Sequence, residues 1–255
     1  MKTQFILTPF ILDRFSPDLE NLADTGWILN KPPLPKGDVQ TRMSAIHKEI
    51  ASHVAETRNA GMIPVSIAGD CCPTIGVTAG LQRAGVNPLL IWFDAHGDFN
   101  TWDTTPSGFL GGMPLAMTVG LGEQKMPQAV GLRSLPQENI ILTDARDLDP
   151  GEKALVRGSK IRHLRDPKEL VEIPLAGHEI YVHFDTDVIN PLDAPAMSYL
   201  AKGGPRASEL EEIFRYLAQT GQIAAVSMAT WNPDSDKDRR SRDTSLTLLS
   251  ILLGK

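Results

Sequence analysis

The sequence predicts an α/β protein in which a mostly parallel sheet lies between two layers of helices. Three observations support this prediction. Short apolar runs recur along the chain, segments with helical spacing separate them, and the apolar residues within each run are continuous rather than alternating. Continuous runs suit strands that are covered on both faces. Because strands that alternate with helices pair in parallel with helices on either side, we expect a three-layer α/β/α fold.

The expected strands are short and rich in Ile, Val, Leu and aromatic residues. They cover residues 4–10, 63–69, 88–94, 138–145, 179–185 and 223–229. The expected helices cover residues 39–60, 73–85, 150–158, 206–220 and 241–253. In the first helix, Ile46, Ile50 and Val54 share one face, and Gly61 follows as a stop signal. Two long loops rich in Gly and Pro, 97–115 and 186–206, begin where strands end, which is where parallel sheets bind ligands.

Composition narrows the class of protein. We find no internal repeat or linker, so residues 1–255 are expected to form a single domain. The net charge of −6 argues against a nucleic-acid partner. No apolar stretch reaches the ~18 residues that span a membrane, and no signal peptide is recognised. The two cysteines, Cys71 and Cys72, are neighbours and therefore do not make a disulfide framework. A cytoplasmic protein is expected.

Metal-ligating residue types cluster at three strand ends. They are Asp70 and Cys71 after the second strand, Asp94, His96 and Asp98 at the third, and His183, Asp185 and Asp187 at the fifth. Either acidic motif alone is equally well explained by loop capping. Together they favour a metal site, because carboxylates crowded in apolar surroundings take up protons unless a cation is present. Oxygen-rich ligands with one imidazole suit Mn²⁺. Two such ions about 3.5–4 Å apart could share a water and make it a hydroxide at neutral pH.

These motifs resemble those of the ureohydrolases, the arginase and agmatinase family of dinuclear manganese enzymes. The matching segments are AGDCC, DAHGDFNTWDTTPSGFLGGMP, ARDLDPGE, HFDTDVINP and ATWNP, which stand for the family's GGDH, DAHxDxN, RDxDPGE, FDxDxxDP and ExNP motifs. The resemblance runs from about residue 60 onward. It implies the family's arginase-like three-layer α/β/α fold and a C–N hydrolase that acts on a small-molecule amidine or guanidine.

The resemblance also implies a site with two Mn²⁺ ions per chain. The first ion would be held by Cys71, Asp94, Asp98 and Asp185, and the second by His96, Asp94, Asp185 and Asp187. A metal-bridging hydroxide would attack the central carbon of the substrate. By the same resemblance Asp98 is the catalytic residue that orients this hydroxide and relays its proton.

An amino-acid-like substrate is implied by four positions that match the family's binding loop. Asn100, Thr105 and Ser107 would hold a carboxylate, and Asp149 would hold an ammonium group. The alternative is that Asn100 and Ser107 only stabilise turns in a loop rich in Gly and Pro.

Three positions depart from the family pattern. Cys71 replaces a histidine ligand, Gly111 replaces the loop histidine that shuttles protons, and Thr230 replaces the glutamate that grips the guanidinium. A buried free cysteine is also commonly a small hydrophobic residue, so ligation by Cys71 stays open. At Thr230, a substrate-binding position, a hydroxyl accepts a hydrogen bond without neutralising a cation.

The Cys-for-His exchange and the missing loop histidine resemble the Nω-hydroxy-L-arginine hydrolases of D-cycloserine biosynthesis, so Nω-hydroxy-L-arginine is the expected substrate. One alternative is a non-catalytic binding or regulatory protein of arginase type, and another is a hydrolase of a neutral amide-like substrate. The oligomeric state, homo-oligomer or monomer, stays open. His183, two residues before Asp185 on the same strand face, is a candidate supporting residue of the site. We expect His47, His53, His163 and His178 to have solvated or capping roles.

Overall fold

The computed structural model describes residues 2–255 and contains an eight-stranded sheet in the order β4-β1-β5-β10-β9-β6-β7-β8. Every neighbouring pair in this sheet is parallel. The strands are β1 (Thr3–Thr8), β4 (Ile28–Leu29), β5 (Ile63–Ala68), β6 (Leu89–Asp94), β7 (Ile140–Asp144), β8 (Arg162–Leu164), β9 (Glu179–Asp185) and β10 (Gln222–Ala229). A separate antiparallel ribbon joins β2 (Phe10–Ile11) to β3 (Arg14–Phe15).

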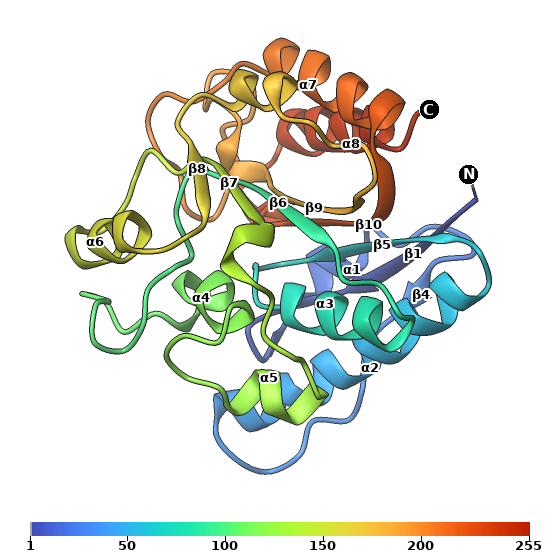
Figure 1. The fold of residues 1–255 in the computed structure, drawn as a ribbon. Helices are drawn as coiled ribbons and strands as arrows, with labels where there is room; N and C mark the ends of the chain where they lie inside the picture. Colours follow the sequence, from blue (N-terminus) through green and yellow to red (C-terminus); the bar gives the residue numbers. More distant parts are fainter. Residues whose placement is uncertain (1) are drawn as a thin grey trace.

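Helices cover the sheet on both faces, which confirms the predicted three layers (Figure 1). One face carries α7 (Ala207–Thr220) and α8 (Arg240–Leu252). The other carries α2 (Val39–Asn59), α3 (Thr74–Arg83) and α5 (Lys125–Val130). The remaining helices are α1 (Pro17–Glu20), α4 (Pro114–Thr118) and α6 (Pro150–Gly158).

The continuous apolar runs become central strands because each strand faces two cores. Along β6, Ile91 and Phe93 belong to the core beneath α7 and α8. The alternate residues Leu90 and Trp92 belong to the core beneath α2 and α3. All four side chains are fully buried. A run without polar alternation is therefore required by the two-sided burial of this strand.

Helices α2 and α3 pack closely because α3 presents glycines to its neighbour. A Cβ atom on Gly76 would lie 2.7 Å from the carbonyl oxygen of His47, and one on Gly80 would lie 2.7 Å from that of Ala51. His47 itself is 1% exposed in the α2 interface. The expectation that His47 is solvated or caps a helix is therefore wrong, because its side chain is almost completely removed from water.

All expected strands and helices are present, with ends shifted by a few residues. The sequence patterns did not reveal β2, β3, β4 or β8, which have two or three residues each. Such short segments carry too little of a periodic pattern to be recognised. Within residues 2–255, no helix is long and apolar enough to cross a bilayer.

Candidate metal centre

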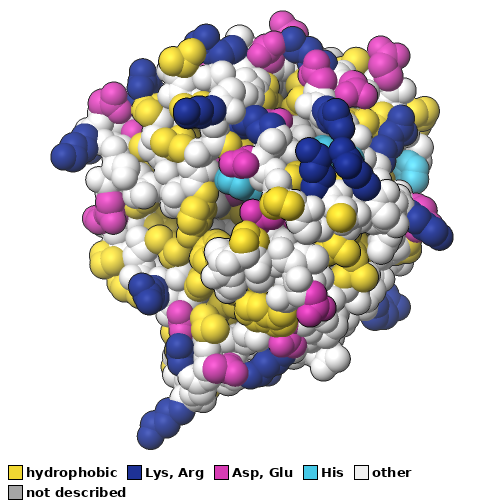
Figure 2. All heavy atoms as spheres, turned by 90° about the vertical axis from the view of Figure 1, so that its left-hand side faces the viewer, with side chains coloured by type: hydrophobic (Ala, Val, Ile, Leu, Met, Phe, Trp, Pro, Cys, Tyr) yellow, Lys and Arg dark blue, Asp and Glu magenta, His cyan; other side chains and the backbone are white. Residues whose placement is uncertain are grey.

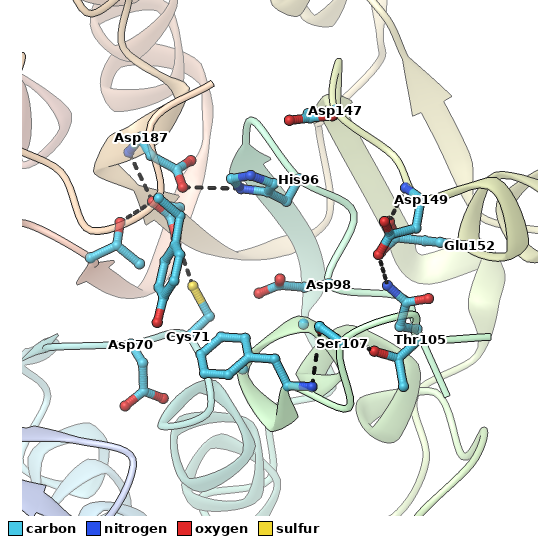
Figure 3. A pocket seen from close by; sticks show the side chains of 17 residues that line it. Asp70, Cys71, His96, Asp98, Thr105, Ser107, Asp147, Asp149, Glu152 and Asp187 are labelled. Carbon is cyan, nitrogen blue, oxygen red and sulfur yellow. Dashed lines mark hydrogen bonds and ion pairs between the residues drawn. The ribbon is translucent and has the colours of Figure 1, made fainter. Parts of the chain in front are cut away.

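The candidate site lies at the carboxyl ends of four adjacent central strands, β5, β10, β9 and β6. Cys71 follows β5, Asp94 ends β6, Asp185 ends β9 and Thr230 follows β10. Parallel strands finish at the same edge of a sheet, so these side chains meet although they are far apart in the sequence. Figure 3 shows Cys71, His96, Asp98 and Asp187 directed toward one space.

The first group of donors contains sulfur, nitrogen and oxygen. Ligand atoms of Cys71, Asp94, His183 and Asp185 all lie within 4.8 Å of one another. The four side chains are buried. The Cys71 thiol donates a hydrogen bond to Asp185 Oδ2 at 2.8 Å. This contact places the sulfur inside the cluster of donors, as expected for a ligand.

The second group contains only nitrogen and oxygen donors. Ligand atoms of Asp94, His96 and Asp187 lie within 4.8 Å of one another. His96 Nδ1 is 3.1 Å from Asp187 Oδ2 and 3.5 Å from Asp94 Oδ1. Asp94 belongs to both groups, whereas Asp185 belongs to the first alone. The arrangement can therefore hold two cations that share the Asp94 carboxylate.

Backbone and side-chain donors fix the carboxylates in place. Asp94 Oδ2 accepts from Trp92 Nε1 at 2.9 Å, and its Oδ1 accepts from the His96 backbone N–H at 2.7 Å. Asp185 Oδ1 accepts from the Asp187 backbone N–H at 2.8 Å and from the Thr230 hydroxyl. Such supporting bonds orient ligands and reduce their reorganisation when a metal binds.

Asp98 belongs to neither of the two groups but lines the same cavity. Its backbone has a φ of 48°, in the left-handed region, which turns the chain at the end of DAHGD. The side chain is buried, and among residues 2–255 its Oδ2 atom has no hydrogen-bond partner. Figure 3 shows this carboxylate pointing into the cavity.

His183, a candidate supporting residue in the sequence, lies among the metal donors of the first group. Its ring is fully buried, and its Nδ1 pairs with Ser227 Oγ at 2.8 Å. The side chain shares a strand face with Asp185, two residues along β9, and that spacing was the signal in the sequence. Burial lowers the pKa of His183 to about 3, which favours the neutral imidazole that metals bind.

The pKa values of the clustered acidic side chains show whether cations fit this site. Burial, followed by repulsion from neighbouring carboxylates, raises the pKa values of Asp185, Asp98 and Asp187. Burial and the charge of Asp185 also raise the pKa of the Cys71 thiol. Without cations the cluster therefore holds protons that metals would displace. Buried oxygen, nitrogen and sulfur donors of this kind fit a pair of divalent ions.

The acidic floor opens into a cavity of about 190 Å³, and the expected substrate positions line its wall. Asn100 Nδ2 donates to Asp149 Oδ2 at 3.0 Å. Ser107 Oγ accepts from the Phe109 backbone N–H at 3.2 Å, and Thr105 Oγ1 lies 3.4 Å from Ser107 Oγ. These residues hold the loop in shape while remaining on the cavity surface, so loop stabilisation and substrate contact are compatible. Thr230 also lines the cavity, although its hydroxyl is directed to Asp185.

An aromatic ring occupies the space beside Gly111. A Cβ atom at this position would lie 2.2 Å from Phe109 Cε1 and 2.5 Å from its Cζ. The Phe109 ring packs against Tyr199, with ring centroids 5.2 Å apart, and both residues line the cavity. The proton-shuttle position of the family motif is therefore filled by an apolar ring from two residues earlier.

Glu152 is a cavity residue that sequence reasoning missed. It is 2% exposed and accepts from the Phe99 backbone N–H at 2.8 Å and the Asp149 backbone N–H at 3.2 Å. Burial raises its pKa to about 7. Its signal was the final Glu of ARDLDPGE, which forms a capping box with Asp149 at the start of α6.

The surface on this side of the molecule is strongly charged. In Figure 2, acidic side chains and a histidine are exposed next to a gathering of Lys and Arg side chains. A buried, carboxylate-rich floor with two donor groups that share Asp94, at the carboxyl edge of a parallel sheet, is typical of metal-dependent enzymes with an α/β/α fold.

Comparison with known proteins identifies the family. The sequence model of the arginase family matches residues 21–254. The arginase of Bacillus subtilis (strain 168) is 26% identical, with 95% of this chain and 90% of the relative covered. The hepatic arginase of Aquarana catesbeiana is 30% identical, with 81% and 69% covered. The chain belongs to the arginase family, whose members are metal-dependent hydrolases.

Solved structures agree with this assignment. The crystal structure of arginase from Bacillus subtilis superposes with a TM-score of 0.85 at 25% identity, covering 100% of this chain and 99% of that one. The arginase of Bacillus cereus gives a TM-score of 0.86 at 25% identity, with the same coverage. The predicted arginase-like fold is confirmed. Family membership also favours an enzyme over a non-catalytic binding protein.

Proposed function

We propose that this protein is a dinuclear metal hydrolase that cleaves a C–N bond in the hydroxyguanidine group of Nω-hydroxy-L-arginine. The observation that carries the proposal is the position of two buried donor groups, joined by Asp94, at the floor of a cavity with amino-acid-binding chemistry on its wall. The floor supplies the reaction centre, and the wall supplies a place for the non-reacting end of the substrate.

Two divalent ions are proposed as the resident metals, with Mn²⁺ at the oxygen-rich group formed by Asp94, His96 and Asp187. When bound, such a pair of ions compensates the acidic charge and supplies an activated water at neutral pH. The residues hold this centre rigidly because the Asp94 carboxylate is anchored by Trp92 Nε1.

Asp98 is proposed as the proton acceptor. Its Oδ2 atom is buried, lacks a partner among residues 2–255 and faces the cavity. A carboxylate oxygen that faces the cavity without a partner among these residues is free to accept a proton from a water bound at the floor. Asp98 would orient the attacking water and then carry its proton toward the leaving amine.

The wall is proposed to hold the amino-acid end of the substrate. The Asp149 carboxylate suits an ammonium group, and the Asn100, Thr105 and Ser107 side chains supply neutral donors for a carboxylate. The Thr105 and Ser107 hydroxyls accept bonds from the loop backbone and share one hydrogen bond with each other, which leaves one hydroxyl proton available for donation.

Two departures from the family motif favour a hydroxyguanidine over a guanidine. The Thr230 hydroxyl is already bonded to Asp185, and it carries no charge with which to neutralise a guanidinium. At Gly111 no side chain can relay a proton. An N-hydroxyguanidine is less basic than a guanidine, so we expect the absence of an anionic clamp and of a proton relay to impair its hydrolysis less.

The test is an assay of the protein loaded with Mn²⁺ alone and, in parallel, with Zn²⁺ and Mn²⁺ together. The substrates are L-arginine, Nω-hydroxy-L-arginine, agmatine and 4-guanidinobutyrate, and urea and hydroxyurea are measured as products. We expect hydroxyurea from the hydroxylated substrate, with a higher kcat/KM than for the other three. A higher kcat/KM for arginine would overturn the substrate assignment. Absence of turnover for all four would overturn the guanidine hydrolase itself.

A hydrolase of a neutral amide-like substrate is a second candidate, and the uncharged Thr230 favours it. Ammonia release from L-glutamine and other neutral amides distinguishes the two. Hydrolysis of such amides without turnover of any guanidine would establish this second candidate in place of the first.

A further inference from the structure

We propose that His183 is a metal ligand, and that His183 and Cys71 together make one of the two metal positions select a softer ion of the zinc type. The other position, formed by Asp94, His96 and Asp187, keeps the preference for manganese. This inference rests on the metal centre of the proposed function. It concerns which ion each position binds, and it is independent of the substrate.

The orientation of the imidazole supports ligation. Ser227 Oγ lies 2.8 Å from His183 Nδ1 and 2.7 Å from the Tyr181 hydroxyl. Ser227 is therefore the hydrogen-bond partner of Nδ1, one of the two ring nitrogens. The other nitrogen, Nε2, is completely buried and has no hydrogen-bond partner among residues 2–255. Metal-bound histidines usually have this arrangement, with one nitrogen on the metal and the other on a hydrogen-bonding partner.

Packing prevents the ring from turning to find another partner. The Trp92 ring lies against His183 with centroids 4.0 Å apart. The Trp92 Nε1–H is itself bonded to Asp94, so the two rings and the carboxylate are held as one unit. A buried nitrogen left without a partner destabilises the fold, and natural proteins rarely retain one without a role.

The surroundings of His183 supply the remaining ligands. A donor atom of the ring lies within 4.8 Å of donor atoms of Cys71, Asp94 and Asp185. This set of one sulfur, one nitrogen and two carboxylates has the four-donor composition that zinc accepts in proteins. The second group has no sulfur. Because thiolates favour softer ions whereas carboxylates suit Mn²⁺, the two positions differ in selectivity.

In this assignment Cys71 and His183 act together at one metal position. The imidazole is supplied from β9, on the strand next to Asp94, and the thiolate from the end of β5. Asp98, which lies outside both groups, is left free to face the cavity.

The first experiment measures metal affinity in the full-length protein. The wild type, His183→Ala, Ser227→Ala and the control His178→Ala, an exposed position, are each titrated with Zn²⁺ and Mn²⁺ against a chelator. Loss of a ligand's hydrogen-bonding partner costs roughly 10–100-fold in affinity. We expect Ser227→Ala to fall in that range, His183→Ala to exceed it for one Zn²⁺ per chain, and His178→Ala to match the wild type.

The second experiment needs no variant. X-ray absorption of the wild type loaded with one equivalent of Zn²⁺ should show one sulfur at about 2.3 Å and one imidazole at about 2.0–2.1 Å from the ion. His183→Asn keeps a polar side chain in case His183→Ala fails to fold, and it should lose the imidazole signal while retaining the sulfur.

Two outcomes would overturn the inference while leaving the proposed hydrolase intact. One is tight Zn²⁺ binding without a sulfur neighbour. The other is a Zn²⁺ affinity of His183→Ala or His183→Asn equal to that of the wild type. Failure of the wild type to bind either ion would overturn the inference and the proposed metal hydrolase together, and the competition titration distinguishes that case.

Discussion

At the scale of single residues, Asp94 connects the two donor groups. One of its oxygens accepts from Trp92 Nε1 and the other from the His96 backbone N–H. Each carboxylate oxygen still has a second lone pair, so the carboxylate can accept these bonds and bind cations at the same time. Its orientation is set before a metal arrives, which means that the quality of the site depends on residues that touch no metal.

Replacing Trp92 tests this dependence. Trp92→Phe keeps an aromatic ring in the core but removes the donor to Asp94 Oδ2. We expect metal affinity to fall by roughly 10–100-fold, as for the loss of other supporting hydrogen bonds. Trp102→Phe is the control, since Trp102 is 47% exposed. Unchanged affinity in Trp92→Phe, measured by competition with a chelator, would show that the indole does not position the carboxylate.

Asp98 offers a test that separates catalysis from metal binding. Because Asp98 lies outside both donor groups, Asp98→Asn should retain two metals per chain. The change removes the proposed base, so kcat should fall by about 10²–10⁴-fold. Metal content is measured alongside the hydroxyurea assay. Loss of one metal in Asp98→Asn would instead place this carboxylate among the ligands, as the family motif implies.

At the scale of elements, the loop after β6 places an apolar ring at the position where the resemblance to the family implies a proton-shuttling histidine. The Phe109 ring covers Gly111 and contacts Tyr199, which follows β9. The two long loops of the sheet edge therefore meet through aromatic side chains at the cavity. A side chain at position 111 and the present position of the Phe109 ring exclude each other.

A pair of variants tests this exclusion. Gly111→His alone should displace the ring, lower thermal stability and leave arginine hydrolysis unimproved. Phe109→Ala combined with Gly111→His provides the space, so arginine turnover should rise by up to the roughly 10²-fold that a general acid contributes. Steady-state kinetics and thermal unfolding are the measurements. Equal stability and activity of the two variants would show that Phe109 does not occupy the histidine's place.

Helix α2 contains a buried histidine, His47, that stays neutral in the folded protein. Burial lowers the pKa of His47 to about 3. Below pH 6.5, His47 is protonated in the unfolded chain but stays neutral in the folded chain. His47 therefore lowers the free energy of unfolding as the pH falls from 6.5 toward 3. Between pH 7 and pH 4.5, the free energy of unfolding should fall by about 2–3 kcal/mol more in the wild type than in His47→Leu.

Urea unfolding of metal-free protein at the two pH values measures this difference. His178→Leu is the control, because His178 is exposed and its replacement removes a histidine without touching the α2–α3 interface. An identical loss of stability in the wild type and His47→Leu would show that the buried histidine takes up its proton without unfolding.

At the scale of the whole molecule, the sequence was sufficient to predict the layers and the edge where the site forms. Runs such as PLLIWFD show no polar alternation, and a strand with cores on both faces requires that pattern. The positions of Cys71, Asp94 and Asp185 followed, because residues after parallel strands converge at one edge.

Other features depended on contacts that no local pattern records. His47 has no sequence feature that distinguishes it from an exposed helical histidine, and its burial depends on how the folded chain packs around α2. His183 shares a strand face with Asp185, but its free nitrogen is evident only from the bond between Nδ1 and Ser227. The division of donors, with Asp98 outside both groups, depends on distances between loops and could not be derived from spacing.

The central claim is that the buried acids, which separate parallel strands bring together, bind two cations that compensate their charge. An anomalous-scattering map of the metal-loaded crystal tests it most directly. We predict two peaks about 3.5–4 Å apart, with Asp94 bridging them, Cys71 and His183 beside one, and His96 and Asp187 beside the other. A single peak, or no peak within reach of Asp94, would contradict the account.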